Sequence, residues 1–572
     1  MISDLKKIFH LISDKELKKL YLLSFLLFVS IIIEVASLGL LFPTIEIVLD
    51  SGNISNNFIF SIFQFFNISN VYQIKISLII LIIFLFLFKT IFMVIITFFQ
   101  SRFLSKQKAD LSRRLFTLYL KQNYTFHLNS NSSLLFKNIH TETWHVNMYV
   151  AALIQIIVES SLVLSVFLIL IIIEPLGTIF ISILLGLSSF LFFKKFKNKI
   201  SNWGEKGVYL NEAISKITLE SFNGIRELIL YGKLDSVKRK YESIINSRSE
   251  IEVKHQVMSQ LPRFFIELIG IISIMVLVFI MLLQSKTSLN IISVASVFVA
   301  GTFRMMPSFN RILTSLQNLR FFREPLKLVY NEFNNLKNDL SGSESKKFIF
   351  KNKVYFNDVT FGYSDKKIIL ENINLSISYG QTIGIIGESG AGKSTFVSLL
   401  TGLIKPTKGE IVIDDFSLKT NTNNWQNLVG YVPQSIFLLD DSILNNITLE
   451  DDQEKIDFER VIKCINDSQL NKFVNSLPDK LNTVVGEKGS LISGGQLQRI
   501  GIARALYSNP SILILDEASS ALDSKTEKKL MNLVYEELIG LTKIIISHNK
   551  SNLDRCDHVY EIKNGVLSEN FL

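Results

Sequence analysis

The chain has 572 residues and a mass of 65.2 kDa, which is too long for one hydrophobic core and predicts at least two structural units. Hydrophobic residues make up 48% of the sequence, charged residues only 19%, and the mean hydropathy is +0.33, so we expect a large membrane-embedded part. The net charge of +9 comes without an Arg/Lys-rich tract carrying interleaved aromatic residues, so we expect no nucleic-acid partner and assign the charge to a surface facing anionic lipid. Two cysteines, Cys464 and Cys556, allow no disulfide framework and no zinc pattern.

Six apolar stretches in the first 330 or so residues are each about as long as the ~20 residues that cross a bilayer. They lie near 20–45, 76–100, 146–173, 175–193, 257–284 and 291–318. The third and fourth meet at Glu174-Pro175, which predicts a tight hairpin outside the membrane. The first twenty residues mix acids and bases and lack the features of a signal peptide, so we expect the first span to be retained.

The loops between these stretches predict the orientation of the chain. The segments 101–145 and 194–255 are rich in Lys and Arg, whereas 35–74 contains neither. Basic loops stay on the cytoplasmic side, so both termini are predicted to be cytoplasmic. The aromatic external segment 57–69 has the pattern of a helix lying on the outer leaflet, although packing against neighbouring spans would explain it equally well.

The composition changes after the last apolar stretch. A polar Gly/Ser-bearing run, NDLSGSESKK, marks a linker, and short β-branched runs then alternate with helical patterns. We therefore predict an all-α six-helix membrane domain over 1–335, a linker over 336–348 and an α/β domain over 349–572.

A phosphate-binding loop opens the second domain. A β-strand pattern over 382–386 leads into GESGAGKS and then an amphipathic helix, which is GxxxxGK[ST] in its required setting. Backbone N–H groups of such a loop surround phosphates, Lys393 is expected to reach the β- and γ-phosphates, and Ser394 offers its hydroxyl to Mg²⁺. The predicted ATP-binding residues of this segment are Gly387, Glu388, Ser389, Gly390, Ala391, Gly392, Lys393, Ser394 and Thr395.

A buried strand pattern, ILIL, ends in Asp516 and Glu517. The carboxyl ends of strands in open α/β sheets are where ligands bind. Asp516 suits the Mg²⁺ shell, and Glu517 suits polarisation of the attacking water. The α/β domain is therefore predicted to be a P-loop NTPase.

Together these motifs resemble the ATP-binding-cassette (ABC) family, and the resemblance covers the whole chain. Ile492–Gln496 (ISGGQ) resembles the family signature with Ile in the first position, and Val485–Gly489 resembles the X-loop of exporters. By this resemblance the remaining site residues are Tyr363 on the adenine, Gln434 on Mg²⁺, Asp523 in a D-loop over 520–523, and His548 on the γ-phosphate. A lone His or Tyr is more often structural, but here the motifs follow the family order. Asn549 stands where the family usually has Arg, which we expect to be harmless.

The same resemblance implies a homodimer. In this family the signature, here Ser493, Gly494, Gly495 and Gln496, completes the ATP site of the opposite subunit. A single cassette therefore needs a second copy, and a two-fold homodimer is the simplest closed arrangement. The presence of Glu517 and His548 implies ATP hydrolysis rather than binding alone. Coupling to the membrane helices is expected through loops near 124–137 and 217–233.

Four cations interrupt the predicted spans: Lys89, Arg263, Arg304 and Arg311. Ionisable groups in hydrocarbon are costly, so they face a cavity or a partner. Lys89 could instead pair with Glu34, and Arg263 with Glu267 or with the membrane interface. Arg304 and Arg311 are seven residues apart on one helix face, which favours an anion-binding cavity.

The membrane part resembles lipid-linked oligosaccharide flippases of bacterial N-glycosylation, in FRMMPSFNRILTS, in LPRFFIE and in the aromatic external segment. This resemblance implies an exporter in the bacterial inner membrane that moves a polyprenyl-pyrophosphate-linked glycan to the outer leaflet. Lys89 stands where we would expect Arg, which could change headgroup preference. The alternatives are an exporter of lipid A, peptide or hydrophobic drug, and a non-transporting regulator, which the intact Glu517 disfavours.

Overall fold

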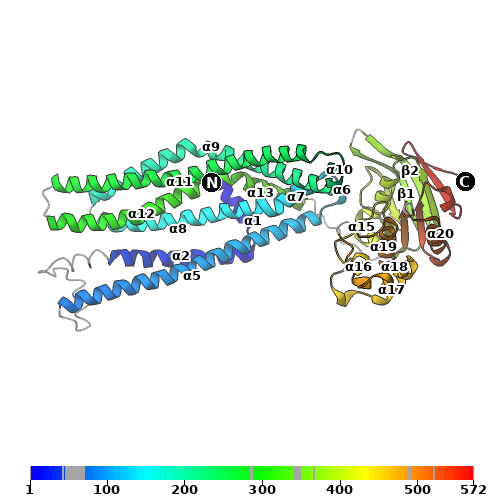
Figure 1. The fold of residues 1–572 in the computed structure, drawn as a ribbon, viewed down its shortest axis with the longest axis horizontal. Coiled ribbons are helices and arrows are strands. Elements are labelled where there is room, and N and C mark those ends of the chain that lie inside the picture. Colours follow the sequence, from blue (N-terminus) through cyan, green and yellow to red (C-terminus); the bar gives the residue numbers. More distant parts are fainter. Residues whose placement is uncertain are drawn as a thin grey trace. The chain divides into compact units, whose positions relative to one another are not determined.

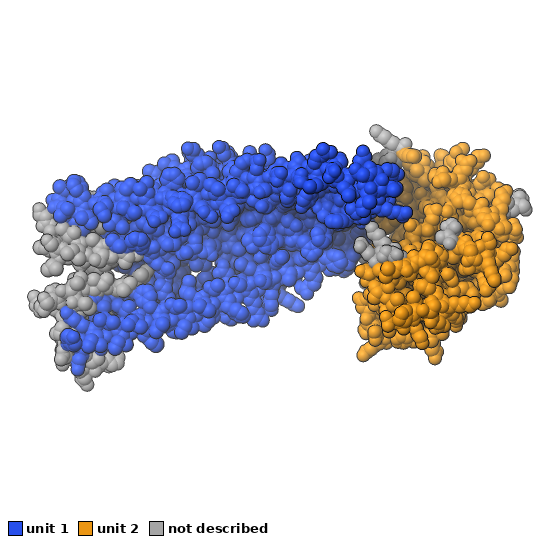
Figure 2. Space-filling view, viewed as in Figure 1, with its two compact units in different colours: residues 1–122, 127–340 blue, residues 123–126, 341–572 orange. Residues whose placement is uncertain are grey.

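The computed structural model describes residues 2–40, 44, 71–173, 175–283, 288–338, 349–364, 367–486, 491–519 and 522–570. The chain forms two compact units (Figure 2): unit 1 comprises residues 1–122 and 127–340, and unit 2 comprises 123–126 and 341–572. Residues 123–126, from the first predicted cytoplasmic segment, therefore group with the α/β part of the chain. The predicted segment 57–69, Glu174 of the hairpin and 339–348 of the linker lie outside the described residues.

The described part of unit 1 is helical (Figure 1). Its α-helices are α1 (Ile2–Leu11), α2 (Asp14–Gly39), α5 (Val71–Leu120), α6 (Tyr124–Asn129, whose first residues belong to unit 2), α7 (Ser132–Lys137), α8 (Thr143–Ile173), α9 (Pro175–Asn223), α10 (Ile225–Leu230), α11 (Leu234–Leu283), α12 (Ser288–Phe321) and α13 (Arg323–Asn338). A π-helical turn, η1 (Asn138–Glu142), joins α7 to α8. Several helices run well past their apolar stretch, as in α5, which continues from the predicted span 76–100 into the basic residues beyond it.

Five helices in the described part of the chain are long and apolar enough to cross a membrane, and they overlap the first five predicted spans. The first predicted span, 20–45, extends beyond the end of α2 at Gly39. The sixth predicted span, 291–318, falls on α12, a continuous helix whose crossing of the membrane stays a prediction. The linker prediction began too early, because α13 continues to Asn338.

Helix packing in unit 1 gives two groups. Helix α2 packs along α5, whereas α12 packs along α8, and α11 packs on both α9 and α12. Small residues permit the close approach of α12: a Cβ on Gly301 would lie 2.9 Å from Leu170 of α8, and one on Gly270 of α11 would lie 1.7 Å from Met306. The second group therefore has a tightly packed interior.

Unit 2 contains two sheets. The strands are β1 (Lys353–Ser364), β2 (Lys367–Ser378), β3 (Thr382–Gly387), β4 (Lys408–Ile413), β5 (Phe416–Ser417), β6 (Val429–Val432), β7 (Ile512–Asp516), β8 (Thr542–Ile546), β9 (His558–Lys563) and β10 (Val566–Glu569). An antiparallel sheet has the order β2-β1-β4-β5, and a larger sheet has the order β10-β9-β3-β8-β7-β6. In the larger sheet all neighbours are parallel except β10 and β9. The α-helices are α14 (Lys393–Leu400), α15 (Leu418–Gln426), α16 (Ile443–Thr448), α17 (Phe458–Asp467), α18 (Asn471–Ser476), α19 (Gly494–Tyr507) and α20 (Ser524–Asn532).

The central strands β7 and β8 are buried at every position, as expected of parallel strands covered on both faces. Because β3, β8 and β7 are adjacent and parallel, their carboxyl ends share one edge of the sheet. The segments that follow these three strands carry the phosphate loop, the Asp516-Glu517 pair and His548.

Candidate functional site

The phosphate loop lies between β3 and α14. Lys393 folds back into this loop, where its Nζ donates hydrogen bonds to the carbonyl oxygens of Gly387 at 2.7 Å and Glu388 at 3.2 Å. Gly392, just before α14, has φ +112°, and a Cβ there would lie 2.9 Å from Leu370. The turn therefore requires glycine at this position.

The residues around this turn differ in exposure. Ser389 and Gly390 at the tip of the loop are exposed, as is Ser394 on the first turn of α14, whereas Thr395 is buried. The positive end of α14 adds to the field of the loop N–H groups, which suits an anion. Ser394 thus lies on the accessible side, whereas Thr395 is buried, and its contact with ATP stays a prediction.

The three predicted catalytic side chains come together at the carboxyl edge of the sheet. Glu517 has a positive φ of 50°, and its carboxylate accepts a hydrogen bond from Gln434 Nε2 at 2.6 Å. Its other oxygen lies 2.8 Å from His548 Nε2, and that nitrogen is 3.4 Å from Lys393 Nζ. The strained backbone at Glu517 aims its carboxylate into this cluster.

Asp516 lies beside this cluster at the end of β7. Its carboxylate is buried and accepts a hydrogen bond from the Tyr431 hydroxyl at 3.2 Å. Burial raises the pKa of Asp516, the Tyr431 hydrogen bond lowers it, and the neighbouring Glu517 carboxylate raises it again. Burial, Asp516 and Tyr124 all raise the pKa of Tyr431. Tyr431 could not be identified from sequence, because only the pairing of β6 with β7 brings it to Asp516.

Four of the other predicted ATP-site residues have local structural partners. Ser493 caps α19: its hydroxyl oxygen accepts a hydrogen bond from the Gln496 backbone N–H at 3.3 Å. The Gln496 side-chain oxygen in turn accepts a hydrogen bond from the Ser493 backbone N–H at 2.8 Å. Asp523 caps α20 and accepts from the Thr526 hydroxyl at 2.6 Å, which lowers its pKa. Tyr363 is 57% exposed, with its ring edge-on to a neighbouring phenylalanine, so one ring face is accessible. Ser520, Ala521 and 487–489 of the predicted X-loop lie outside the described residues.

Arg504 is a positioning residue that the sequence did not single out. From α19 it donates hydrogen bonds to the carbonyl oxygens of Asn446 at 2.7 Å and Phe437 at 2.9 Å. Burial lowers the pKa of its guanidinium. Arg504 therefore ties the signature helix to the segment that follows Gln434. Asn549 accepts a hydrogen bond from Ser551 N–H at 3.2 Å and so caps the short turn after His548.

Three of the four predicted substrate cations are paired. Lys89 lies 2.7 Å from Glu34, the alternative considered above, and Arg304 donates to the same carboxylate at 2.8 Å. Arg311 makes a bidentate pair with Glu159, at 2.6 and 3.0 Å. Arg304 and Arg311 are each paired with a carboxylate from another helix, but their side chains remain 35% and 44% exposed, so their contact with an anion stays a prediction.

A polar pocket of about 650 Å³ lies between α8, α11 and α12. Its lining residues are Gln155, Ser259, Gln260, Arg263, Phe264, Asn310, Arg311, Thr314 and Ser315. Within the described part of the chain Arg263 has no ion pair, so the pairing with Glu267 is not formed. An adjoining pocket of about 340 Å³ shares Arg263, Asn310 and Arg311 and adds Glu267. Of the four predicted substrate cations, the structure brings together Arg263 and Arg311 in one pocket and places Lys89 and Arg304 on Glu34.

Comparison with known proteins identifies the second unit. The profile of the ABC transporter family matches residues 370–520. The chain is 28% identical over 488 residues to the ATP-dependent lipid A-core flippases of Escherichia coli K12 and Shigella flexneri, covering 81% of this chain and 80% of each relative. A solved bacterial Atm1-family ABC exporter with ATP bound has the same fold, with a TM-score of 0.79, 21% identity, and coverage of 96% of this chain and 94% of that one. Residues 370–520 therefore form an ABC transporter domain, and over most of its length the chain is similar to ABC exporters in which a helical membrane domain is fused to an ATP-hydrolysing cassette.

Proposed function

We propose that the protein is a homodimeric flippase that uses ATP to move a saccharide lipid with an anionic group from the cytoplasmic to the outer leaflet of a bacterial inner membrane. The observation that carries the proposal is the polar pocket lined by Arg263 and Arg311. Its residues lie at the cytoplasmic ends of the predicted spans 257–284 and 291–318. A headgroup could enter it from the inner leaflet.

The lining of the pocket suits a sugar with a charge better than a bare pyrophosphate. Amide and hydroxyl groups dominate it, and they match sugar hydroxyls as donors and acceptors. The side-chain amide oxygen of Asn310 (Oδ1) is buried without a hydrogen-bond partner among the described residues, so it is available to a donor group of a ligand. Arg311 is already neutralised by Glu159, which leaves Arg263 as the cation for one anionic group.

Two kinds of saccharide lipid fit this description. The sequence resemblance favoured a polyprenyl-pyrophosphate-linked oligosaccharide. The relatives that align with this chain over 80% of their own length, in contrast, are lipid A-core flippases. The mixed charge of the pocket also weakens the argument for a pyrophosphate group. A lipid A type of substrate is therefore the better supported of the two.

The ATP site supports hydrolysis with Mg²⁺. The Ser394 hydroxyl, the Gln434 amide oxygen and the Asp516 carboxylate are oxygen donors of the kind that Mg²⁺ prefers. No cluster of three or more His, Cys, Asp or Glu gathers as metal ligands among the described residues, so phosphate oxygens would complete the shell. Bound Mg²⁺ neutralises charge on the phosphates. Glu517, held by Gln434 and His548, is placed to accept a proton from the attacking water.

The dimer follows from the signature. Ser493 and Gly494 are exposed on unit 2, where they could reach a second cassette. We propose that they complete the partner's ATP site, that both termini are cytoplasmic, and that residues 123–126 connect the cassette to the membrane helices. Light scattering of the Glu517→Gln variant with ATP should give twice the chain mass of 65.2 kDa; a single-chain mass would contradict the dimer.

The substrate proposal is tested in proteoliposomes by ATPase stimulation and by flipping of two lipids, lipid A and a polyprenyl-pyrophosphate oligosaccharide. Lipid A is expected to stimulate hydrolysis and to be flipped. Arg263→Gln should raise the lipid A concentration for half-maximal stimulation by about tenfold, because one charge-assisted contact is lost. Lys216→Gln, on an exposed cation far along α9, is the matched control and should change nothing. A response to the oligosaccharide alone, or an unchanged Arg263→Gln variant, would contradict the proposal.

A further inference from the structure

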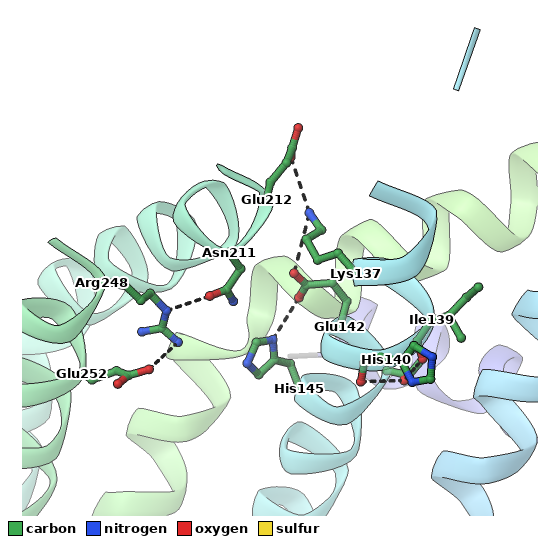
Figure 3. Close-up of polar contacts among 10 residues, drawn as sticks. Lys137, Ile139, His140, Glu142, His145, Asn211, Glu212, Arg248 and Glu252 are labelled. Atoms are coloured by element: carbon green, nitrogen blue, oxygen red, sulfur yellow. Dashed lines mark hydrogen bonds and ion pairs between the residues drawn. The ribbon is translucent and has the colours of Figure 1, made fainter. Parts of the chain in front are cut away.

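A buried ion cluster surrounds the π-helical turn η1 in unit 1 (Figure 3). Lys137 and Glu142 are both fully buried, and Lys137 Nζ lies 3.8 Å from Glu142 Oε1 and 3.5 Å from Glu212 Oε2. The other oxygen of Glu142 lies 3.0 Å from His145 Nδ1. A buried ion pair contributes little net stability, so its presence suggests a positional role.

The π-turn and the ion pair depend on each other. Lys137 and Glu142 are five residues apart, and in an α-helix such residues point about 140° apart around the axis. A π-turn closes on residue i+5 and brings them to one face. If η1 became α-helical, the pair would separate and α7 would rotate relative to α8. The pair and the turn therefore form one structural element.

One side of this element reaches the junction between α12 and α13. The His145 ring stacks on Phe322, with centroids 5.2 Å apart and planes at 23°. Phe322 is the residue between the end of α12 and the start of α13. Its neighbour Phe321 stacks on His255 of α11 at 4.0 Å, and a Cβ on Gly204 of α9 would lie 2.1 Å from the Phe321 carbonyl oxygen. The junction is thus clamped by aromatic stacking.

A second path joins η1 to α13. Asn138 Nδ2 donates to the Tyr119 hydroxyl at 3.0 Å, and that hydroxyl donates to Glu332 of α13 at 2.9 Å. Asn138 is also almost fully buried. At the other end, α7 begins six residues after Phe126, the last residue of the segment 123–126 that groups with unit 2. η1 therefore lies between the segment that groups with the cassette and the helix that leads to the linker.

We propose that η1 is a coupling relay in which Lys137, Glu142 and His145 are positioning residues. Movement of residues 123–126 during the ATP cycle acts on the π-turn, and His145 passes the change to Phe322 and the α12–α13 junction. The substrate pocket on α11 and α12 then changes its accessibility. This inference rests on the proposed ATP-driven transport but not on the identity of the lipid.

The experiment measures hydrolysis and pocket accessibility separately. Ser259→Cys places a reporter thiol in the pocket, and the protein without it gives the background from Cys464 and Cys556. Labelling by a membrane-impermeant maleimide is measured in nanodiscs with and without ATP and vanadate. In the otherwise unchanged protein we expect the labelling rate to change by about fivefold or more as the populated state shifts.

The test variant is Lys137→Met combined with Glu142→Gln, which removes both charges together and avoids an unpaired buried ion. It should keep ATPase activity within about twofold while the ATP-dependent labelling change disappears. Lys238→Met with Glu242→Gln removes an exposed ion pair of α11 and should leave both readouts unchanged. A persisting labelling change in the test variant would overturn the relay. Loss of ATPase activity in a folded variant would do so too, because the pair would then serve hydrolysis itself.

If the double variant does not fold, His145→Phe decides the question. It keeps a ring on Phe322 and removes only the contact with Glu142. Loss of the labelling change with intact hydrolysis would support the relay, and a normal change would overturn it. Absence of any ATP-dependent change in the unmutated reporter protein would contradict the proposed transport cycle rather than the relay.

Discussion

Glu34 is predicted to be the membrane-domain carboxylate whose loss destabilises unit 1 most. It lies on α2 between two cations, 2.7 Å from Lys89 of α5 and 2.8 Å from Arg304 of α12. The Arg304 contact joins the α2–α5 pair to the group of helices that packs with α12. Replacing Glu34 with Gln leaves two cations without their counter-ion.

The size of the effect follows from distance and exposure. At an effective dielectric constant of about 20, each contact is worth ~6 kcal/mol of attraction before desolvation is counted. Removing one partner of a buried pair costs about 3–5 kcal/mol in practice. The Lys89 side chain is 12% exposed, whereas that of Arg304 is 35% exposed, so we discount the contribution of the Arg304 pair. We therefore expect a loss of about 3 kcal/mol, or roughly 6 °C in Tm for a unit of this size.

The assay is thermal unfolding of the purified protein in one detergent, followed by intrinsic fluorescence. Glu34→Gln combined with Lys89→Met removes the more buried unpaired cation and should recover about half of the loss. Glu220→Gln removes an exposed i,i+4 partner of Lys216 and should leave Tm unchanged. A Glu34→Gln variant with unchanged Tm, or a double variant less stable than the single one, would refute the reasoning.

Three further predictions concern the cassette. Glu517→Gln should lower phosphate release about 10²–10⁴-fold while fluorescent ATP still binds, because only the proton acceptor is lost; wild-type turnover would remove Glu517 from that role. Gly392→Ala should abolish ATP binding, measured by equilibrium dialysis, because its φ is +112° and the added methyl would meet Leu370; unchanged binding would mean that the loop can adapt. Burial raises the pKa of the Cys464 and Cys556 thiols to about 11, so the thiolate fraction, and with it alkylation of the native protein, should rise about tenfold per pH unit between pH 7 and 9. Alkylation is measured by mass spectrometry, with the urea-unfolded protein as the control. Alkylation of the native protein at pH 7 as fast as that of the unfolded protein would contradict the burial of these two thiols.

Much of the ATP site could be predicted from the sequence because its motifs are local. The phosphate loop, Asp516-Glu517 and His548 each follow a strand pattern, and parallel strands present their ends at one edge of a sheet. The contacts that hold the site needed the fold. Tyr431 meets Asp516 only through strand pairing, and Arg504 reaches Asn446 of α16, 58 residues earlier in the chain. In the membrane unit the sequence placed the cations but not Glu159, because helix packing alone brings α8 beside α12.

By itself the sequence indicated the chemistry of the cassette and predicted the order of domains, the spans and their orientation, because hydropathy, charge and motif spacing are properties of the chain. The tertiary structure decided which of the predicted substrate cations are paired with a carboxylate. It paired Lys89 and Arg304 with Glu34, paired Arg311 with Glu159, and left Arg263 lining the pocket. It also produced the π-turn that allows Lys137 to meet Glu142, a pairing that α-helical spacing would forbid. Whether a cation is free or paired depends on which helices lie side by side, and only the folded protein fixes that arrangement.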